Sequence, residues 1–486
     1  MRCLRVLLRA MLVGVRKAVL RDVRSCISTQ LLVIIVSVMM VVIVVRQMQG
    51  PMDVVIKEEI LQTKDMFATM TPQETEPEVI FKSGMGIYNT SRIPAIVHHK
   101  GTFLAFCEAR KDTSHDIGNI HIVLRRGQRS GWKVKWGELQ VVASRHGYRA
   151  MNPVPIVDKV LDVILLVYHL IPTWVSQWKL IRDGVFKQLV MVTRSFDNGE
   201  TWTIAKDITA STLGQMKPPP ALYAPGPGHG IQLKSGRLLV AGNYFVKDEV
   251  GPLLHYLDNF DNTTNYANVI ASDDNGETWF LGGRIPFGVD PFWRPIHGNE
   301  ATAVEVDKGH VCINGRTLHA DLTRVVAISE NGGETFGAGR LARELVEPGY
   351  RLTDENFVIP AKAGGCQASM IGFPAPRPYV TDSGTWVLFS NPASPKFRER
   401  LSIRLSKDGC KTWSPAWNVF SNFSGYSDLT YFEMRNPITG LKSQNFAVLF
   451  EAGNTTSHDS IMLKMFNIES LLGGLDKGKL KFDPAV

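Results

Sequence analysis

The chain has 486 residues, of which 44% are hydrophobic and 21% charged, and a formal net charge of +8. Residues 1–24 hold seven cations and one acid, a net +6, which leaves only +2 for residues 25–486. A nearly neutral body excludes the basic surface typical of nucleic-acid-binding proteins. The length allows one large domain or two to three smaller ones.

The first predicted element is an uncharged stretch from Ser25 to Val45. As a helix it would rise about 30 Å, the thickness of a bilayer core. Because the basic residues 1–24 precede it and cations stay cytosolic, the pattern predicts a signal anchor. We therefore expect a single-pass type II membrane protein with a luminal or extracellular body. A cleaved signal peptide is the alternative, although no clear small-residue cleavage site follows.

Two further features bear on the compartment. Four Asn-x-Ser/Thr sequons support an exported body: Asn89, Asn262, Asn422 and Asn454. The cysteines downstream of the apolar segment are widely spaced, with no CxxC and no zinc pattern: Cys107, Cys312, Cys366 and Cys410. They are compatible with buried thiols or with up to two disulfides, and their spacing predicts no metal site.

Composition divides the chain into five regions. Residues 1–24 form a basic cytosolic segment, 25–45 the transmembrane anchor and 46–78 a stalk or linker, since "TPQETEPE" is acidic and rich in proline. From residue 79 onward, short apolar runs such as "GTFLAFCEAR" and "GRLLVAGNYF" alternate with turn residues, which predicts many antiparallel strands. This body extends to residue 470, and 471–486 form a C-terminal tail.

A turn motif recurs four times within the body. The skeleton Ser-x-Asp-x-Gly-x-Thr-Trp begins at Ser195, Ser272, Ser329 and Ser406. The acid is expected to accept hydrogen bonds from turn backbone, and the glycine to supply a positive φ. The third copy has Asn331 for the acid, and the fourth has Cys410 for the glycine. Repeats of this kind predict an all-β fold, a six-bladed β-propeller, with a β-sandwich or solenoid as the alternative.

These Asp-box hairpins, together with Arg-Ile-Pro at residues 92–94, resemble the animal exo-α-sialidases (neuraminidases) over nearly the whole body. Three stretches are similar to the lysosomal sialidase: Leu104–Asp116, Tyr223–Gln232 and Leu388–Ser406. The resemblance implies hydrolysis of terminal sialic acids from glycoproteins, glycolipids such as gangliosides, or oligosaccharides. No cofactor is implied.

The resemblance also implies three arginines that bind the substrate carboxylate: Arg92, Arg316 and Arg398. Their role has a chemical reason, because planar guanidinium groups bind carboxylates bidentately. Arg316 lies in "INGRT", where relatives usually have Ala in place of Gly315. Arg400 and Arg404 are close competitors of Arg398.

Tyr426, in "SGYSDL", matches the family's nucleophile. Sialidases are a known exception among glycosidases in using tyrosine. A neutral phenol avoids repulsion from the substrate carboxylate, provided that a neighbouring acid removes its proton during attack. Glu300 is the expected partner, because it directly precedes an alternating apolar run that is typical of a strand. Glu305 is the competing residue.

Asp116 matches the family's loop acid, which protonates the leaving oxygen and later activates water. Asp112 is the competing residue. Arg110 is expected to help hold the substrate carboxylate or the acid loop. Glu451, in "LFEAG", lies where the family has an acid that orients the first arginine.

Two other functions stay open from the sequence: a catalytically silent sialic-acid-binding propeller and a trans-sialidase that passes sialic acid to a second sugar. The expected partners are a sialylated substrate and, through the N-terminal helix, a membrane, with no nucleic acid. The resemblance and the anchor together allow the lysosome, the Golgi or the plasma membrane, with a protective partner protein if the protein is lysosomal.

Overall fold

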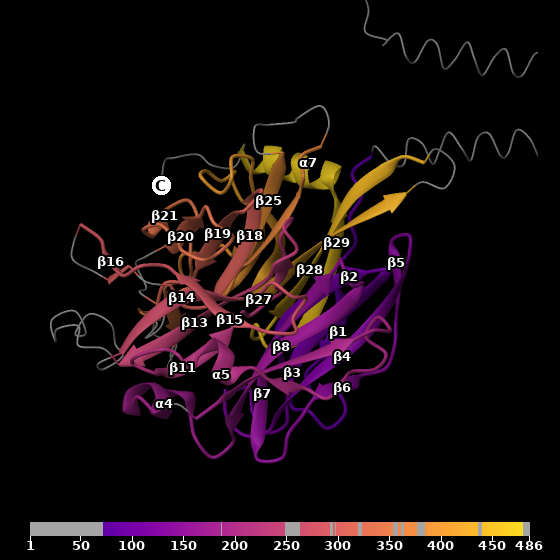
Figure 1. Ribbon diagram of the computed structural model, residues 1–486. Helices are drawn as coiled ribbons and strands as arrows, with labels where there is room; N and C mark the ends of the chain where they lie inside the picture. The colour runs from indigo at the N-terminus through magenta and orange to yellow at the C-terminus, as the bar shows by residue number, and fades with distance from the viewer. Residues whose placement is uncertain are drawn as a thin grey trace, which may run out of the picture. The chain divides into compact units, whose positions relative to one another are not determined.

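The computed structural model describes residues 71–185, 187–247, 263–291, 295–296, 298–318, 323–352, 358–360, 364–376, 384–435 and 440–479. All of them belong to one compact unit, residues 70–486. The described residues form an all-β domain whose antiparallel sheets follow one another in a propeller-like arrangement (Figure 1). The all-β prediction is confirmed.

Three sheets in the first half of the domain are each built from consecutive strands. The first contains β2 (Thr90–His99), β3 (Thr102–Arg110), β4 (Ile120–Ser130), β5 (Lys133–Trp136) and β6 (Gln140–Ala143). The second contains β7 (Tyr148–Asp158), β8 (Val163–Pro172), β9 (Leu189–Ser195) and β10 (Lys206–Asp207). The third contains β11 (Pro220–Pro225), β12 (Ile231–Gln232), β13 (Leu238–Lys247), β14 (Thr263–Ser272) and β15 (Phe280–Arg284). The connections carry α4 (Gln177–Asp183) and α5 (Thr209–Thr212).

The second half contains a four-stranded and a seven-stranded sheet. The four strands are β18 (Ala301–Asp307), β19 (His310–Gly315), β20 (Arg324–Ser329) and β21 (Arg340–Ala342). Two small sheets pair β16 (Gly288–Val289) with β17 (Pro295–Ile296) and β22 (Tyr350–Leu352) with β23 (Val358–Pro360). The last sheet contains β1 (Glu78–Lys82), β24 (Ser369–Pro374), β25 (Thr385–Pro392), β26 (Glu399–Ser406), β27 (Trp417–Arg435), β28 (Lys442–Gly453) and β29 (Ser460–Asn467), and α7 (Ile468–Lys479) follows it.

The described residues do not form six separate blades. The seven-stranded sheet is continuous because β27, with 19 residues, is long enough to serve two neighbours. Its first part, up to Phe423, pairs with β26, and the part from Phe423 to Arg435 pairs with β28. The strand register shifts between Ser424 and Ser427, where a β-bulge bends the strand. The core lies between neighbouring sheets, as in the cluster that joins β2–β4 to β7–β9.

The four predicted turn motifs adopt the same turn. In the first, the Ser195 hydroxyl accepts a hydrogen bond from the N–H of Gly199, at 2.7 Å, and Asp197 accepts one from the N–H of Thr201, at 2.9 Å. The fifth residue has a positive φ in every copy, including 66° at Cys410. Asn331, in place of the acid, keeps the side-chain contact with the threonine of the motif, because its amide donates to the Thr335 hydroxyl at 2.9 Å. The turn prediction is therefore confirmed even in the two irregular copies.

The prediction of a single-pass type II membrane protein is corrected by the helices that the structure describes. Within the described ranges, no helix is both long and apolar enough to cross a membrane. The longest, α7, has 12 residues and would rise only about 18 Å. It packs its buried residues Leu471 and Leu475 into the core of the last sheet. The apolar segment 25–45, on which the prediction rested, lies outside the described residues.

Candidate active site

Arg92 occupies a β-bulge in β2. The pairing of β2 with β3 shifts register between Arg92 and Ala95, and Ile93 has a φ of 59°. Pro94 has no N–H to donate to a ladder, which favours an interruption at this point. The N–H of Ile93 donates instead to Glu451 Oε1 at 3.0 Å, and Arg92 Nε contacts the same oxygen at 3.0 Å. The bulge thus directs Arg92 onto a buried carboxylate of β28.

Tyr426 occupies the bulge in β27, and Glu451 also holds this strand. The N–H of Tyr426 donates to Glu451 Oε2 at 3.1 Å. Gly425 is required beside it, because a Cβ there would lie 2.2 Å from Glu451 Oε2. Burial acts to raise the pKa of Glu451, but Arg92, His458 and the N–H groups of Ile93 and Tyr426 together outweigh it and hold the pKa below its ordinary value. Glu451 is therefore an anion that fastens Arg92 and Tyr426 to one point.

Glu300 and Arg316 face Tyr426 from the neighbouring sheet. Glu300 precedes β18, Arg316 follows β19, and the N–H of Arg316 donates to the Glu300 carbonyl at 2.9 Å. Arg316 Nη1 lies 2.9 Å from Glu300 Oε2, and the Tyr426 hydroxyl donates to Glu300 Oε1. Burial and the Glu300 charge raise the pKa of Tyr426 well above its ordinary value, despite the opposing arginines. The phenol of the free site is protonated and already bonded to a base.

Arg398 completes a group of three guanidinium groups around the tyrosine. Its Cζ lies 5.5 Å from the centroid of the Tyr426 ring, and that of Arg92 lies 5.3 Å away. Arg398 donates to the Gly365 carbonyl at 3.3 Å, and within the described ranges no carboxylate pairs with it. The competitors Arg400 and Arg404 do not line the cavity that Arg398 lines. Arg398 therefore carries the unneutralised positive charge of the group.

Asp116 lies at the edge of the site beside Arg110. Arg110 ends β3, is fully buried, and places Nη2 2.7 Å from Asp116 Oδ1. The Asp116 side chain is 48% exposed. Its pKa is lowered, because Arg110 and Arg92 together outweigh the effect of burial, which acts to raise it. Asp112 instead accepts a hydrogen bond from the N–H of Asn119 at 3.3 Å and does not line the cavity.

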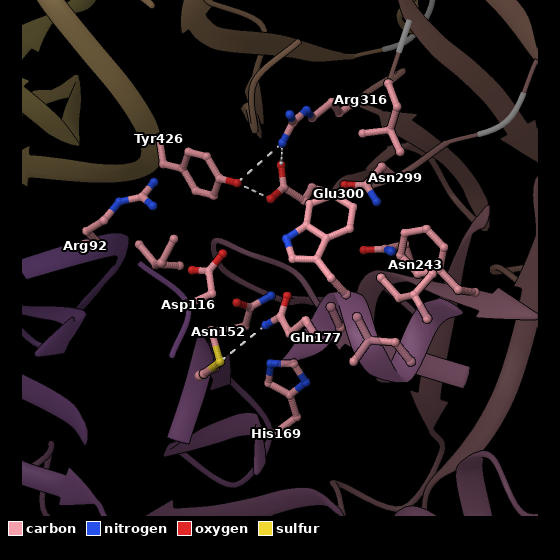
Figure 2. A pocket seen from close by; sticks show the side chains of 18 of the residues that line it. Arg92, Asp116, Asn152, His169, Gln177, Asn243, Asn299, Glu300, Arg316 and Tyr426 are labelled. Carbon is pink, nitrogen blue, oxygen red and sulfur yellow. Dashed lines mark hydrogen bonds and ion pairs between the residues drawn. The ribbon is translucent and has the colours of Figure 1, made fainter. Parts of the chain in front are cut away.

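These side chains line one cavity of about 300 Å³, shown in Figure 2. The predicted residues that line it are Arg92, Arg110, Asp116, Glu300, Arg316, Arg398 and Tyr426. Glu451 lies behind them.

Glu305 lines a second cavity of about 630 Å³ and accepts from the N–H groups of Lys234 and Gly309 at 2.8 and 3.0 Å. None of the described residues form a group of three or more metal-ligating side chains.

Glu108 was missed by sequence analysis. It is fully buried and accepts hydrogen bonds from Arg110 Nη2 at 2.6 Å and from the N–H of Asn152 at 2.8 Å. It therefore holds Arg110, the residue that contacts Asp116. Burial raises its pKa in spite of Arg110. A charged residue inside the apolar run "LAFCEAR" was the signal that could have identified it.

The part of the cavity near α4 was also missed. Arg149 is buried and donates to the carbonyls of Pro172 and Val175 at 2.9 and 2.8 Å, which fixes the chain leading into α4. Trp178 on α4 lines the cavity although 60% of its surface is exposed. His169 and Asn243 line it from β8 and β13 (Figure 2). Their positions depend on sheet packing, for which the sequence carries no local signal.

Comparison with known proteins shows which proteins this chain is similar to. A family model described as "BNR repeat-like domain" matches residues 101–434. Human Sialidase-3 is 30% identical over 425 residues, covering 79% of this chain and 91% of its own. Mouse Sialidase-2 is 30% identical over 409 residues, covering 81% and 96%.

Solved structures show the same fold at lower identity. The Hadza microbial sialidase Hz136 has a TM-score of 0.62 at 22% identity, covering 81% of this chain and 69% of that one. Trypanosoma rangeli sialidase, solved in complex with sialic acid, has a TM-score of 0.55 at 18% identity, covering 84% and 60%.

Proposed function

Because this chain belongs to the animal sialidase family, we propose that the cavity around Tyr426 is its catalytic site. The protein is an exo-sialidase, a glycoside hydrolase that acts on sialylated glycoconjugates. The observation that carries the assignment of the site is the group of three arginines around a tyrosine that is bonded to Glu300.

The arginines supply the site for the substrate carboxylate. Two of the three are paired, Arg92 with Glu451 and Arg316 with Glu300. Arg398 leaves one positive charge to balance the anion that sits on the anomeric carbon of a sialic acid. Guanidinium groups from three separate parts of the chain also restrict its orientation, which presents the anomeric carbon to the tyrosine.

We propose that Tyr426 is the nucleophile. Its oxygen bonds to the anomeric carbon as the bond to the leaving oxygen breaks, and its proton passes to Glu300. Water then attacks the anomeric carbon, the bond to the tyrosine oxygen breaks, and Glu300 returns the proton to that oxygen. Two successive displacements at the same carbon release the sugar with retained configuration. Glu300 can take the proton because it already accepts the hydroxyl in the free site.

Asp116 is positioned to protonate the leaving oxygen and then to activate the water. Half exposure at the edge of the cavity suits a group that must meet both the aglycone and solvent. Its lowered pKa keeps Asp116 ionised at neutral pH, so the protonated fraction that can act as the acid grows as pH falls. A substrate carboxylate that neutralises Arg92 would raise this pKa. We expect the rate of the first step to increase from neutral into acid pH.

We also propose that the seven-stranded sheet corresponds to two blades that share β27, so that the domain counts six blades. The bulge at Gly425 and Tyr426 would then lie at the junction of two blades, where it faces the central cavity.

Transfer of sialic acid to a second sugar is the other candidate activity. The exposed indole of Trp178 at the cavity supports it, because aromatic faces stack on sugars. Incubating the enzyme with a sialoside and excess lactose tests it. Sialyl-lactose formation would favour transfer, and release of free sialic acid alone would exclude it.

The test of the main proposal is hydrolysis of the 4-methylumbelliferyl α-sialoside across acid to neutral pH. We expect Tyr426→Phe to lower kcat by about 10³-fold or more, and Asp116→Ala by about 10²- to 10⁴-fold. Tyr431→Phe is the matched control, because Tyr431 lies on the same strand but lines the other cavity. Near-normal activity of Tyr426→Phe would refute the assignment of the nucleophile.

A further inference from the structure

His169 lines the cavity and carries a buried hydrogen-bond acceptor that is not used. The side chain is 1% exposed, and in the register of β7 and β8 it lies opposite Met151. Its Nδ1 lies 2.8 Å from the Tyr223 carbonyl oxygen, which can only accept, so Nδ1 carries a proton. Among the described residues, Nε2 has no hydrogen-bond partner. Figure 2 shows the ring directed from β8 toward Asn152 and Gln177.

The ring is neutral, so Nε2 presents a lone pair. Burial lowers the pKa of His169 to about 4, and the nearby Arg149 acts in the same direction. The Tyr223 carbonyl and the Asp116 charge oppose these effects without reversing them. A buried acceptor without a donor is unfavourable, and an O–H or N–H group that enters the cavity at this point would satisfy it.

The apolar part of the cavity lining that includes Met151, the residue opposite His169, indicates which part of the sugar comes here. Met151, Ile181, Leu222 and Phe245 all line the cavity and pack in one buried cluster. The polyol tail and ring hydroxyls of a sialic acid would lose their water against such walls. The acyl group on its amide nitrogen is the one substituent that can present apolar surface to them. An acetyl group would fill the space and leave Nε2 without a donor.

We propose that His169 makes this end of the cavity selective for sialic acids whose amide carries a hydroxyacyl group, such as N-glycolyl, over those carrying N-acetyl. The inference rests on the proposed catalytic function of the same cavity. The terminal hydroxyl of the glycolyl group donates to Nε2, while its CH₂ contacts the apolar side chains. The preference arises because the buried acceptor is satisfied by one substrate only.

The experiment compares kcat/KM for two aryl α-glycosides that differ only in the N-glycolyl or N-acetyl group. We expect the wild-type enzyme to favour the glycolyl substrate roughly 3- to 10-fold, the effect of one neutral hydrogen bond. His169→Leu should abolish or reverse this ratio, whereas His169→Gln, which keeps an acceptor, should retain part of it. Both rates are measured on the same preparation, so partial unfolding of a variant lowers both of them and leaves their ratio unchanged.

Two control variants show which acceptor is responsible. Asn243→Leu removes Asn243 Oδ1, a second buried acceptor of the cavity lining that has no partner among the described residues, and should leave the ratio unchanged. His98→Leu changes a histidine that also has an unpartnered Nε2 but lines the second cavity, and both rates should stay near wild type. A wild-type ratio of one or below, or a ratio that survives in His169→Leu, would overturn the inference. Inactivity of the wild type on both substrates would instead count against the catalytic proposal.

Discussion

Glu451 accepts hydrogen bonds from two strands although no solvent reaches its side chain. Arg92, the N–H of Ile93 and the N–H of Tyr426 all converge on its two oxygens. The charge is tolerated because each oxygen is paired, which offsets the cost of burial. A single side chain thus sets the position of one of the arginines proposed to bind the substrate and of the proposed nucleophile, without lining the cavity itself.

Replacing Glu451 with Gln should therefore affect both binding and stability. We expect KM to rise at least tenfold and the free energy of unfolding at pH 7 to fall by about 3–5 kcal/mol, because Arg92 is left buried and unpaired. The depressed pKa of Glu451 means that its contribution is complete above the ordinary glutamate pKa and is lost as pH falls through the lower, folded value. Urea unfolding of wild type and variant should accordingly converge toward acid pH.

Glu433→Gln is the control for this measurement. Glu433 pairs with Lys442 at 2.6 Å, but both side chains are substantially exposed. The change should stay within about 1 kcal/mol and leave KM unaltered. Equal losses in the two variants would show that the Glu451 contacts carry no special weight.

At the scale of elements, the site depends on irregularities in the strands. The bulge at Arg92 to Ala95 in β2 and the bulge at Ser424 to Ser427 in β27 each release an N–H from its ladder. Glu451, on β28, receives both of these N–H groups. A regular ladder would use these donors for pairing and would turn the two side chains away from each other. The bulges therefore create the site.

Gly425→Ala tests the β27 bulge. A Cβ at Gly425 would collide with Glu451 Oε2, so we expect loss of most activity together with a lower Tm. Gly473→Ala is the matched control, because Gly473 lies in α7 with open space around its Cβ position. There the substitution should stabilise the protein by about 0.5–1 kcal/mol and leave activity unchanged. Normal activity of Gly425→Ala would show that the strand can relax without moving the site.

At the scale of the domain, the two ends of the described chain are joined. β1 pairs with β29, from Glu78 opposite Leu463 to Lys82 opposite Ser460. The N–H of Asn467 also donates to the Gln73 carbonyl at 2.9 Å. An early strand thus completes the last sheet and covers an edge that would otherwise be exposed. β28, which carries Glu451, lies immediately beside β29.

Truncation tests this closure. A chain that begins at residue 71 should unfold with a Tm close to that of the full chain, because it keeps β1. A chain that begins at residue 83 loses the burial of Ile80 and Phe81, about 3–6 kcal/mol, and exposes the edge of β29. We expect its Tm to fall and its aggregation to increase, as measured by differential scanning calorimetry and light scattering. Equal Tm values for the two chains would show that β1 contributes little.

Local signals in the sequence determined the strand-rich body, the four turns and the chemical types of the candidate side chains. The turns were predictable because Ser195 and Asp197 bond to backbone within the next four residues. The prediction of a single-pass membrane protein is contradicted, because no helix of the described residues is long and apolar enough to cross a membrane. Within the described ranges six separate blades are not present, because β27 pairs with both β26 and β28 and so joins the last strands into one sheet.

The tertiary structure alone decided which residues meet. Arg92 and Glu451 are 359 positions apart, and Tyr426 and Glu300 are 126 apart, so no local pattern could report their contact. Strand register and bulges decide that Glu300 faces the tyrosine while Glu305 turns to another cavity. They also bring His169, opposite Met151, to the cavity lining, with its Nε2 unpartnered among the described residues. A sequence specifies backbone preference and side-chain chemistry over short distances. The burial, charges and hydrogen bonds around each titratable side chain come from neighbours that only folding brings together.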